Sequence, residues 1–160
     1  MKKRIITYFS VLVILIASVT TSAYAATAEM NLWGFSSSYT VKAAKTLAAS
    51  IGKMKKKSSK KFPSLYMTGN KVTIGINKKA KPGTSAAEYI RVENKGNKRF
   101  TINGIKIGTK KSLVIRKMKK AGFRAIQNGK YFVRGEAGYV TASYKNGKLK
   151  SWTYSLSPTG

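Results

Sequence analysis

The chain has 160 residues, and its 32 lysine and arginine side chains stand against only 4 acidic ones, giving a formal net charge of +28. Such a charge repels itself and favours anionic partners. Cysteine, histidine and aspartate are absent, which excludes disulfides, thiol chemistry and most zinc ligand sets. Hydrophobic residues make up 42% and aromatic residues 11% of the chain, which excludes a disordered protein and predicts a packed core.

The first 25 residues have the organisation of a secretory signal peptide. A basic start at residues 2–4 is followed by an apolar run at 8–19 and a small-x-small cleavage pattern at 23–25. The alternative, an uncleaved membrane anchor, needs about 20 apolar residues, more than this run provides. We therefore expect a signal peptide at 1–25, no transmembrane segment after cleavage, and secretion from a bacterium, with attachment to the cell wall left open.

In the mature chain, the sequence pattern predicts an irregular segment at 26–37 followed by a single domain at 38–160. A helix opens this domain, because Ser38 or Thr40 can cap it and apolar residues then recur at three- and four-residue spacing. The predicted buried stripe of this helix consists of Val41, Ala44, Leu47, Ala48, Ile51 and Met54.

Residues 53–61 contain six lysines in nine positions, the sharpest charge feature of the chain. Cations after a helix favour its negative C-terminal end, but six exceed what one helix dipole requires. Two interpretations stay open: a docking patch for polyanions, or a solvated loop that keeps the protein soluble. The candidate binding residues here are Lys53, Lys55, Lys56, Lys57, Lys60 and Lys61.

Two strand pairs are expected next. Residues 65–67 and 71–77 flank Gly69-Asn70, and residues 78–86 form a loop between two halves. A second hairpin is expected from strands 89–93 and 99–103. An odd, three-residue loop there gathers the apolar residues on one face, namely Ile90, Val92, Phe100 and Ile102.

The second half repeats this order. Thr109 is expected to cap a helix that buries Val114, Ile115, Met118 and Ala121, and Gly122 is expected to end it. Strands are predicted at 123–126 and 130–134, joined at Asn128-Gly129. Further candidate polyanion-binding residues cover the outside of this helix: Lys110, Lys111, Lys117, Lys119 and Lys120.

The final hairpin is predicted from strands 139–144 and 149–156. An odd loop again sorts the side chains. One face then carries Val140, Ala142, Tyr144, Trp152, Tyr154 and Leu156, and the other carries Tyr139, Thr141, Ser143, Ser151, Thr153 and Ser155.

The matching order of elements predicts two pseudo-repeats, at 38–103 and 104–156. Each would be an α-βββ unit, a helix followed by an antiparallel sheet. The predicted fold class is therefore α+β, with tandem helix-plus-sheet units arranged in two layers.

Residues 104–112, the helix after them, its glycine stop and the strands that end in Tyr144-Lys-Asn-Gly-Lys-Leu-Lys-Ser-Trp152 resemble the BamE (SmpA/OmlA) and β-lactamase-inhibitor-protein-like group. The resemblance implies a small α+β domain, sometimes in tandem, that acts by binding other proteins. The chain departs from the group in two ways: it lacks the lipid-bearing cysteine of the lipoprotein members, and its helix ends Ala121-Gly122-Phe123 instead of Leu-Gly-x-Pro.

Catalysis is not expected. Two glutamates flanking a sugar would suit a glycosidase, and Glu88 and Glu136 are the candidates, but surface ion pairs with the many cations explain them better. We expect no catalytic residues, cofactor, metal or small-molecule substrate.

Two binding hypotheses from different classes follow. In the first, the protein holds anionic polymers of the cell surface or its surroundings: teichoic acid, acidic polysaccharide or nucleic acid. The mature chain has 24 lysines and 5 arginines, which favours diffuse, salt-sensitive contacts. In the second, the hydroxyl-rich face of the last hairpin binds a protein partner, as an inhibitor module would, although the solvated face of any antiparallel sheet looks similar.

Overall fold

The computed structural model describes residues 28–30, 40–77, 87–134 and 138–156. The predicted signal peptide, most of the segment at 26–37 and the loop at 78–86 lie outside these residues. Within the segment that was expected to be irregular, Ala28–Met30 forms a short strand, β1.

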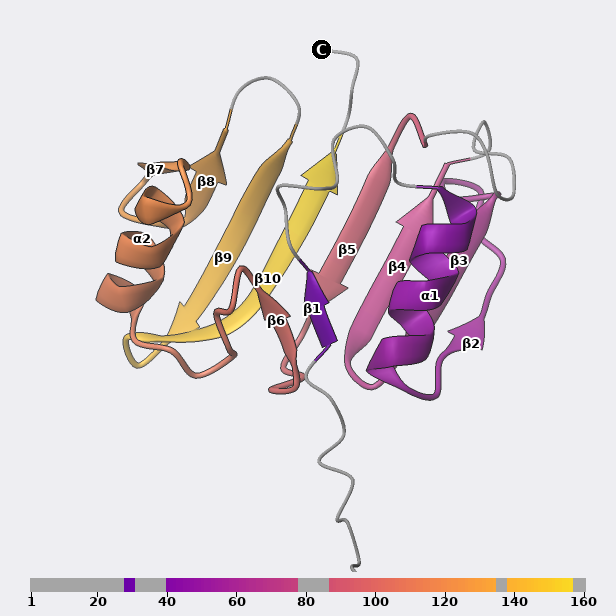
Figure 1. The fold of residues 1–160 in the computed structure, drawn as a ribbon, viewed down its shortest axis with the longest axis horizontal. Helices are drawn as coiled ribbons and strands as arrows, with labels where there is room; N and C mark the ends of the chain where they lie inside the picture. Colours follow the sequence, from indigo (N-terminus) through magenta and orange to yellow (C-terminus); the bar gives the residue numbers. More distant parts are fainter. Residues whose placement is uncertain (1–27, 31–39, 78–86, 135–137, 157–160) are drawn as a thin grey trace, which may run out of the picture.

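A single eight-stranded sheet dominates the described chain, and every neighbouring pair of its strands is antiparallel (Figure 1). Strands β5 and β10 pair at the centre of the sheet, and three further strands extend from each of them to one edge. From edge to edge the strands are β2 (Lys55–Lys56), β3 (Leu65–Gly69), β4 (Val72–Ile76), β5 (Ile90–Asn94), β10 (Lys148–Leu156), β9 (Tyr139–Lys145), β8 (Tyr131–Val133) and β7 (Arg124–Ile126).

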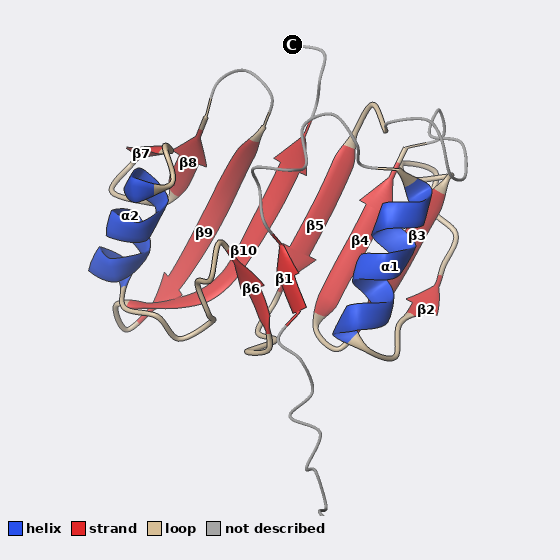
Figure 2. Cartoon of the chain, viewed as in Figure 1, coloured by secondary structure: helices blue, strands red, loops and turns tan. Residues whose placement is uncertain are grey.

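Two helices lie over one face of this sheet (Figure 2). Helix α1 (Val41–Ile51) contacts β4, and helix α2 (Lys111–Lys120) contacts β7 and β10. Between them, β1 pairs in parallel with β6 (Phe100–Ile102). Neither described helix has the length and apolar character that a bilayer span requires.

The predicted tandem of two-layer helix-plus-sheet units is therefore wrong. Strands of both halves join edge to edge, because Val92 and Ile90 of β5 pair with Tyr154 and Leu156 of β10. Side-chain alternation reports which face a residue occupies but not which strand lies beside it. The division into pseudo-repeats at 38–103 and 104–156 stays a prediction.

The first helix begins as predicted. The Thr40 hydroxyl accepts a hydrogen bond from the Ala43 N–H at 3.1 Å, and Gly52, with φ of 107°, ends the helix. Its buried residues are Val41, Ala44, Leu47 and Ala48.

The second helix begins later than predicted. Lys110, not Thr109, occupies the cap position, and its side chain makes no cap hydrogen bond. The Thr109 carbonyl accepts the Leu149 N–H of β10, so it is not available to the first turn of the helix. The predicted stop is confirmed: Gly122 has φ of 83°, and the Phe123 N–H returns to the Met118 carbonyl at 3.0 Å.

The expected hairpin between 89–93 and 99–103 does not form, since β6 pairs with β1 and leaves the main sheet. Asn94, which is fully buried, redirects the chain. Its Oδ1 accepts the N–H groups of Gly96 and Asn97, and its Nδ2 donates to the carbonyls of Asn97 and Phe100. The expected burial of the four apolar residues is still correct, because Ile90, Val92, Phe100 and Ile102 are each at most 2% exposed.

The final hairpin has the predicted faces but reaches them differently. Asn146 and Gly147, with φ of 51° and 69°, make a two-residue turn, which is an even loop. A register shift between Leu149 and Ser151 adds one residue to β10, and this bulge restores the odd parity. Trp152 and Tyr154 consequently face Ala142 and Val140 in the core.

Two tyrosines on the core side of the sheet are expected to lower the free energy of unfolding at alkaline pH. Burial raises the pKa of Tyr154 and of Tyr144 to about 12, from an ordinary value of 10. The folded state therefore keeps protons that the unfolded state loses above pH 10, so this contribution is intact below pH 10 and lost between pH 10 and about 12.

We expect Tyr154→Phe to flatten the fall of unfolding free energy above pH 10 relative to the parent. Chemical denaturation of both proteins across this pH range measures the effect. Lysine deprotonation occurs in both proteins, so its effect cancels in the difference between them. Equal slopes for the two proteins would contradict the assignment.

Candidate functional site

Edge strand β2 and the connection that follows it to β3 carry five of the six lysines of the run. Lys55 and Lys56 pair with Thr68 and Met67, and the Lys57 N–H continues the ladder to the Tyr66 carbonyl at 2.8 Å. Lysines on a short edge strand discourage pairing with other chains. All three lysines are exposed, so the edge presents them to solvent.

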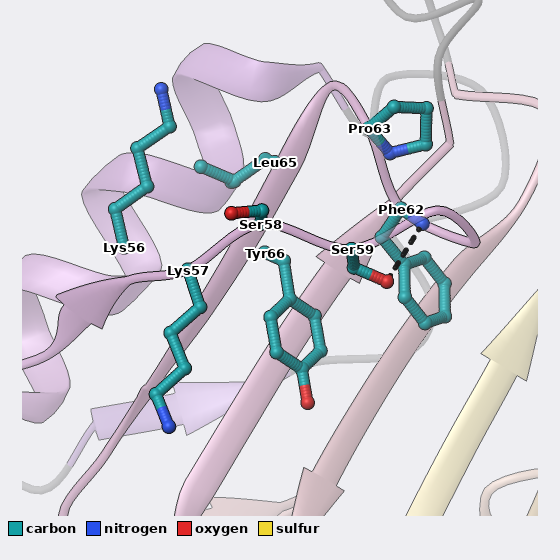
Figure 3. A pocket seen from close by; sticks show the side chains of 8 residues that line it. All are labelled: Lys56, Lys57, Ser58, Ser59, Phe62, Pro63, Leu65 and Tyr66. Carbon is teal, nitrogen blue, oxygen red and sulfur yellow. Dashed lines mark hydrogen bonds between the residues drawn. The ribbon is translucent and has the colours of Figure 1, made fainter.

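Phe62 closes this connection by lying flat on the sheet over Gly75. A Cβ at position 75 would come within 2.6 Å of the Phe62 ring, so the close approach requires glycine there. The Phe62 N–H donates to the Ser59 hydroxyl at 3.3 Å (Figure 3). Phe62 is consequently only 6% exposed, although it follows two lysines in the sequence.

Three aromatic rings form a row on this part of the sheet, on the face opposite the helices. Phe62 stacks between Tyr66, at 5.9 Å, and Tyr89, at 5.7 Å, with rings inclined by 8° and 11°. The Lys61 ammonium lies over the Phe62 and Tyr89 rings, at 5.6 and 5.2 Å from their centroids. Ring–ring and cation–π contacts of this kind contribute about 0.5–1 kcal/mol each. We call Phe62, Tyr66 and Tyr89 the aromatic row.

Two pockets flank the Phe62–Tyr66 pair. The edge pocket, of about 500 Å³, is lined by cationic, hydroxyl and aromatic side chains and by no carboxylate. Figure 3 shows Lys57 and Phe62 on either side of the Tyr66 ring, with Ser58 and Ser59 nearby. The residues that line the edge pocket are Lys56, Lys57, Ser58, Ser59, Phe62, Pro63, Leu65 and Tyr66.

The face pocket, of about 250 Å³, lies beside the edge pocket and shares Phe62 and Tyr66 with it. Its other walls differ in chemistry. Glu93 is 4.0 Å from Arg91 and 3.6 Å from Lys95, in ion pairs exposed enough to contribute under about 1 kcal/mol each. The residues that line the face pocket are Lys61, Phe62, Tyr66, Thr73, Gly75, Arg91 and Glu93.

The two groups of candidate lysines lie at opposite ends of the sheet. Residues 53–61 surround edge strand β2, whereas α2 lies over β7, the other edge (Figure 1). On α2, Lys117 donates to the Gly104 carbonyl at 3.4 Å, and the Lys111 ammonium lies 5.5 Å from the centre of the Tyr144 ring. Lys110, Lys119 and Lys120 are exposed. The fold therefore makes two separate basic surfaces.

The hydroxyl side chains of the last hairpin alternate with buried Trp152 and Tyr154, so they lie on the opposite sheet face. Both described helices lie over the other face (Figure 2). Among the described residues, Tyr139 is the one large hydrophobic side chain that is exposed, at 44%. Ser155 departs from the expectation: it is 1% exposed, because it pairs between Arg91 and Tyr139, whose larger side chains flank it.

Sequence reasoning missed the aromatic row and the face pocket. Two signals could have revealed them: a phenylalanine directly after a lysine run, and Gly75 in the middle of an alternating strand, where a glycine often marks close approach by another group. Pairing across the sheet then places Tyr66 opposite Gly75.

The described residues hold no cluster of three or more metal-ligating side chains. Of the two glutamates weighed for catalysis, Glu88 accepts a hydrogen bond from the Asn77 amide at 3.1 Å, and Glu136 lies outside the described residues. The expectation of a non-enzymatic protein stays a prediction.

No family model matches the chain, and neither the comparison with curated proteins nor that with solved structures returns a match. The resemblance to the BamE-like and β-lactamase-inhibitor-protein-like group therefore stays a prediction.

Proposed function

We propose that this is a secreted bacterial protein that binds anionic polymers at the cell surface without catalysing a reaction. The observation that carries the proposal is the edge pocket, which Lys56 and Lys57 of the basic run line together with hydroxyl and aromatic side chains and without a carboxylate. Several lysine contacts to one polymer release counterions together, which gives affinity that falls steeply with salt. The excess of 24 lysines and 5 arginines over 4 glutamates in the mature chain adds long-range attraction.

The edge pocket is a better candidate than α2 because it combines charge with shape. Its lysines border aromatic and hydroxyl groups, whereas Lys117, Lys119 and Lys120 are exposed on a helix surface. A polymer at the pocket can be partly desolvated, and electrostatic contacts strengthen where water is excluded.

Lys56 and Lys57 line the edge pocket, and exposed Lys60 lies in the same connection. We expect the triple variant Lys56→Gln, Lys57→Gln, Lys60→Gln to lose much of its binding to linear polyphosphate. The slope of log affinity against log salt should fall by about three, roughly one per lost contact. The matched control is Lys117→Gln, Lys119→Gln, Lys120→Gln, which removes the same charge from α2 and should change the slope less. Affinity measured across a salt series tests this.

Equal effects of the two triple variants would return residues 53–61 to the solvated-loop interpretation. Binding by the parent that persists undiminished well above physiological ionic strength would contradict electrostatic binding altogether.

A protein-binding or inhibitory module is the second candidate function. It is supported by the uncovered sheet face, where exposed Tyr139 lies among threonine and serine side chains, since tyrosine is enriched at protein interfaces. A pull-down from the growth medium with the parent and with Thr153→Arg, which places a bulky charge on this face, tests it. A partner retained equally by both would reject this face as the interface.

A further inference from the structure

We propose that the Tyr66 ring, held in place by buried Phe62, is a stacking platform for a sugar ring, so that the favoured ligand is an acidic polysaccharide. This inference rests on the proposed function and names the class of polymer that the same site binds. It assigns the face pocket to a sugar ring and the edge pocket to the adjoining, negatively charged part of the chain.

Phe62 is fixed in place, and Tyr66 is accessible to a ligand. Phe62 is held on Gly75 and flanked by two rings, so it cannot turn to meet a ligand. Tyr66 is half-buried and, like Phe62, lines both pockets, so its ring is the more accessible of the two that the pockets share. Aromatic rings offer flat apolar surface that suits the C–H face of a pyranose.

The polar walls of the face pocket suit sugar hydroxyls. Thr73, Arg91 and Glu93 provide a hydroxyl, a planar donor group and a carboxylate acceptor within one small hollow. Glu93 is 22% exposed on its side chain and can accept from a hydroxyl group. A phosphate in the same place would face this carboxylate and be repelled, which argues against polyphosphate or nucleic acid backbone in this pocket.

The cations are placed to meet the acidic groups of such a polymer. Lys61 borders the face pocket, and Lys56 and Lys57 border the edge pocket on the other side of Tyr66. A chain that crosses the Tyr66 ring would thus find a lysine before and after it. Stacking and charge recognition are separable in this arrangement, because they depend on different side chains.

The test compares two polyanions with the secreted form of the protein: oligogalacturonate, which has acidic pyranose rings, and linear polyphosphate, which has none. We expect Tyr66→Ala to weaken oligogalacturonate binding about tenfold and to change polyphosphate binding less than about twofold. Tyr66→Phe keeps the ring and should retain binding, which separates stacking from loss of fold.

Tyr131→Ala is the matched control. Tyr131 is a half-buried tyrosine of the same sheet with a lysine ammonium 5.5 Å above its ring, but it lies on β8, in the other half. It should leave both affinities unchanged.

The failures are distinguishable. If the parent binds neither polymer, the proposed function is wrong. If it binds both and Tyr66→Ala weakens neither, or weakens both equally, the stacking inference alone is overturned. The inference is also overturned if Tyr66→Ala spares oligogalacturonate but weakens a single-stranded oligonucleotide, because the ring would then stack on bases.

Discussion

Replacing Trp152 by alanine should lower the free energy of unfolding by about 3–5 kcal/mol. Trp152 is 1% exposed, and its ring lies 5.0 Å from that of Phe100, tilted by 46°. It also pairs with Asn94 on one side and Ala142 on the other, at the junction of the two halves of the sheet. Truncation therefore opens a cavity that no single element can close. Urea denaturation of parent and variant measures the loss.

Trp152→Phe is the informative control. Among the described residues, the Trp152 Nε1–H is buried without a hydrogen-bond partner, which costs folding free energy in the parent. Phenylalanine removes that donor while keeping most of the ring, so its loss should be far smaller than that of alanine. If the two variants are equally destabilised, the indole group has a partner or a role that packing does not explain.

Replacing Asn94 by alanine should cost about 3 kcal/mol. The substitution removes four hydrogen bonds, made with Gly96, Asn97 and Phe100, and leaves buried backbone groups unsatisfied. Since these bonds turn the chain out of the sheet toward β6, the loop at 95–99 should loosen as well. Denaturation gives the free energy, and amide hydrogen exchange at Gly96 and Asn97 reports the loop.

The control for this loop is Asn97→Ala. The Asn97 side chain accepts only the exposed Arg99 N–H among the bonds described here, so its removal should cost about 0.5 kcal/mol. A comparable loss from both variants, or unchanged exchange in Asn94→Ala, would show that Asn94 does not organise the turn.

Local features of this fold follow directly from the sequence. Periodicity identifies both helices, and the buried residues Val41, Val114 and Met118 fall where three- and four-residue spacing puts them. Alternation likewise places Trp152 and Tyr154 inward. These predictions succeed because each depends on neighbours in the chain, whose geometry is set by helix and strand repeats.

Long-range features do not follow in the same way. The pairing of β5 with β10 joins residues about 60 positions apart, and nothing in either strand marks its partner. The bulge after Leu149 was hidden because an odd loop and an even loop with one extra residue give the same faces. Asn94 lies in the connection expected between strands 89–93 and 99–103, and nothing in the sequence indicates that its four hydrogen bonds direct β6 away from the main sheet.

The candidate site shows the same division. The lysine run is visible in the sequence, but its relation to Tyr66 and Tyr89 is not, because the aromatic row is assembled from three segments across the sheet. The separation of the run from the lysines of α2 is equally a product of topology, since it depends on which strands end up at the edges.

Those edges also affect how copies of the molecule behave toward one another. An open sheet presents unpaired backbone groups at its outer strands, where further chains can add and aggregation begins. Here one edge strand has only two residues, both exposed lysines, and the other begins with exposed Arg124. Two copies approaching through these edges would bring like charges together, so the cations of the proposed polymer site would also oppose edge-to-edge assembly of the protein with itself.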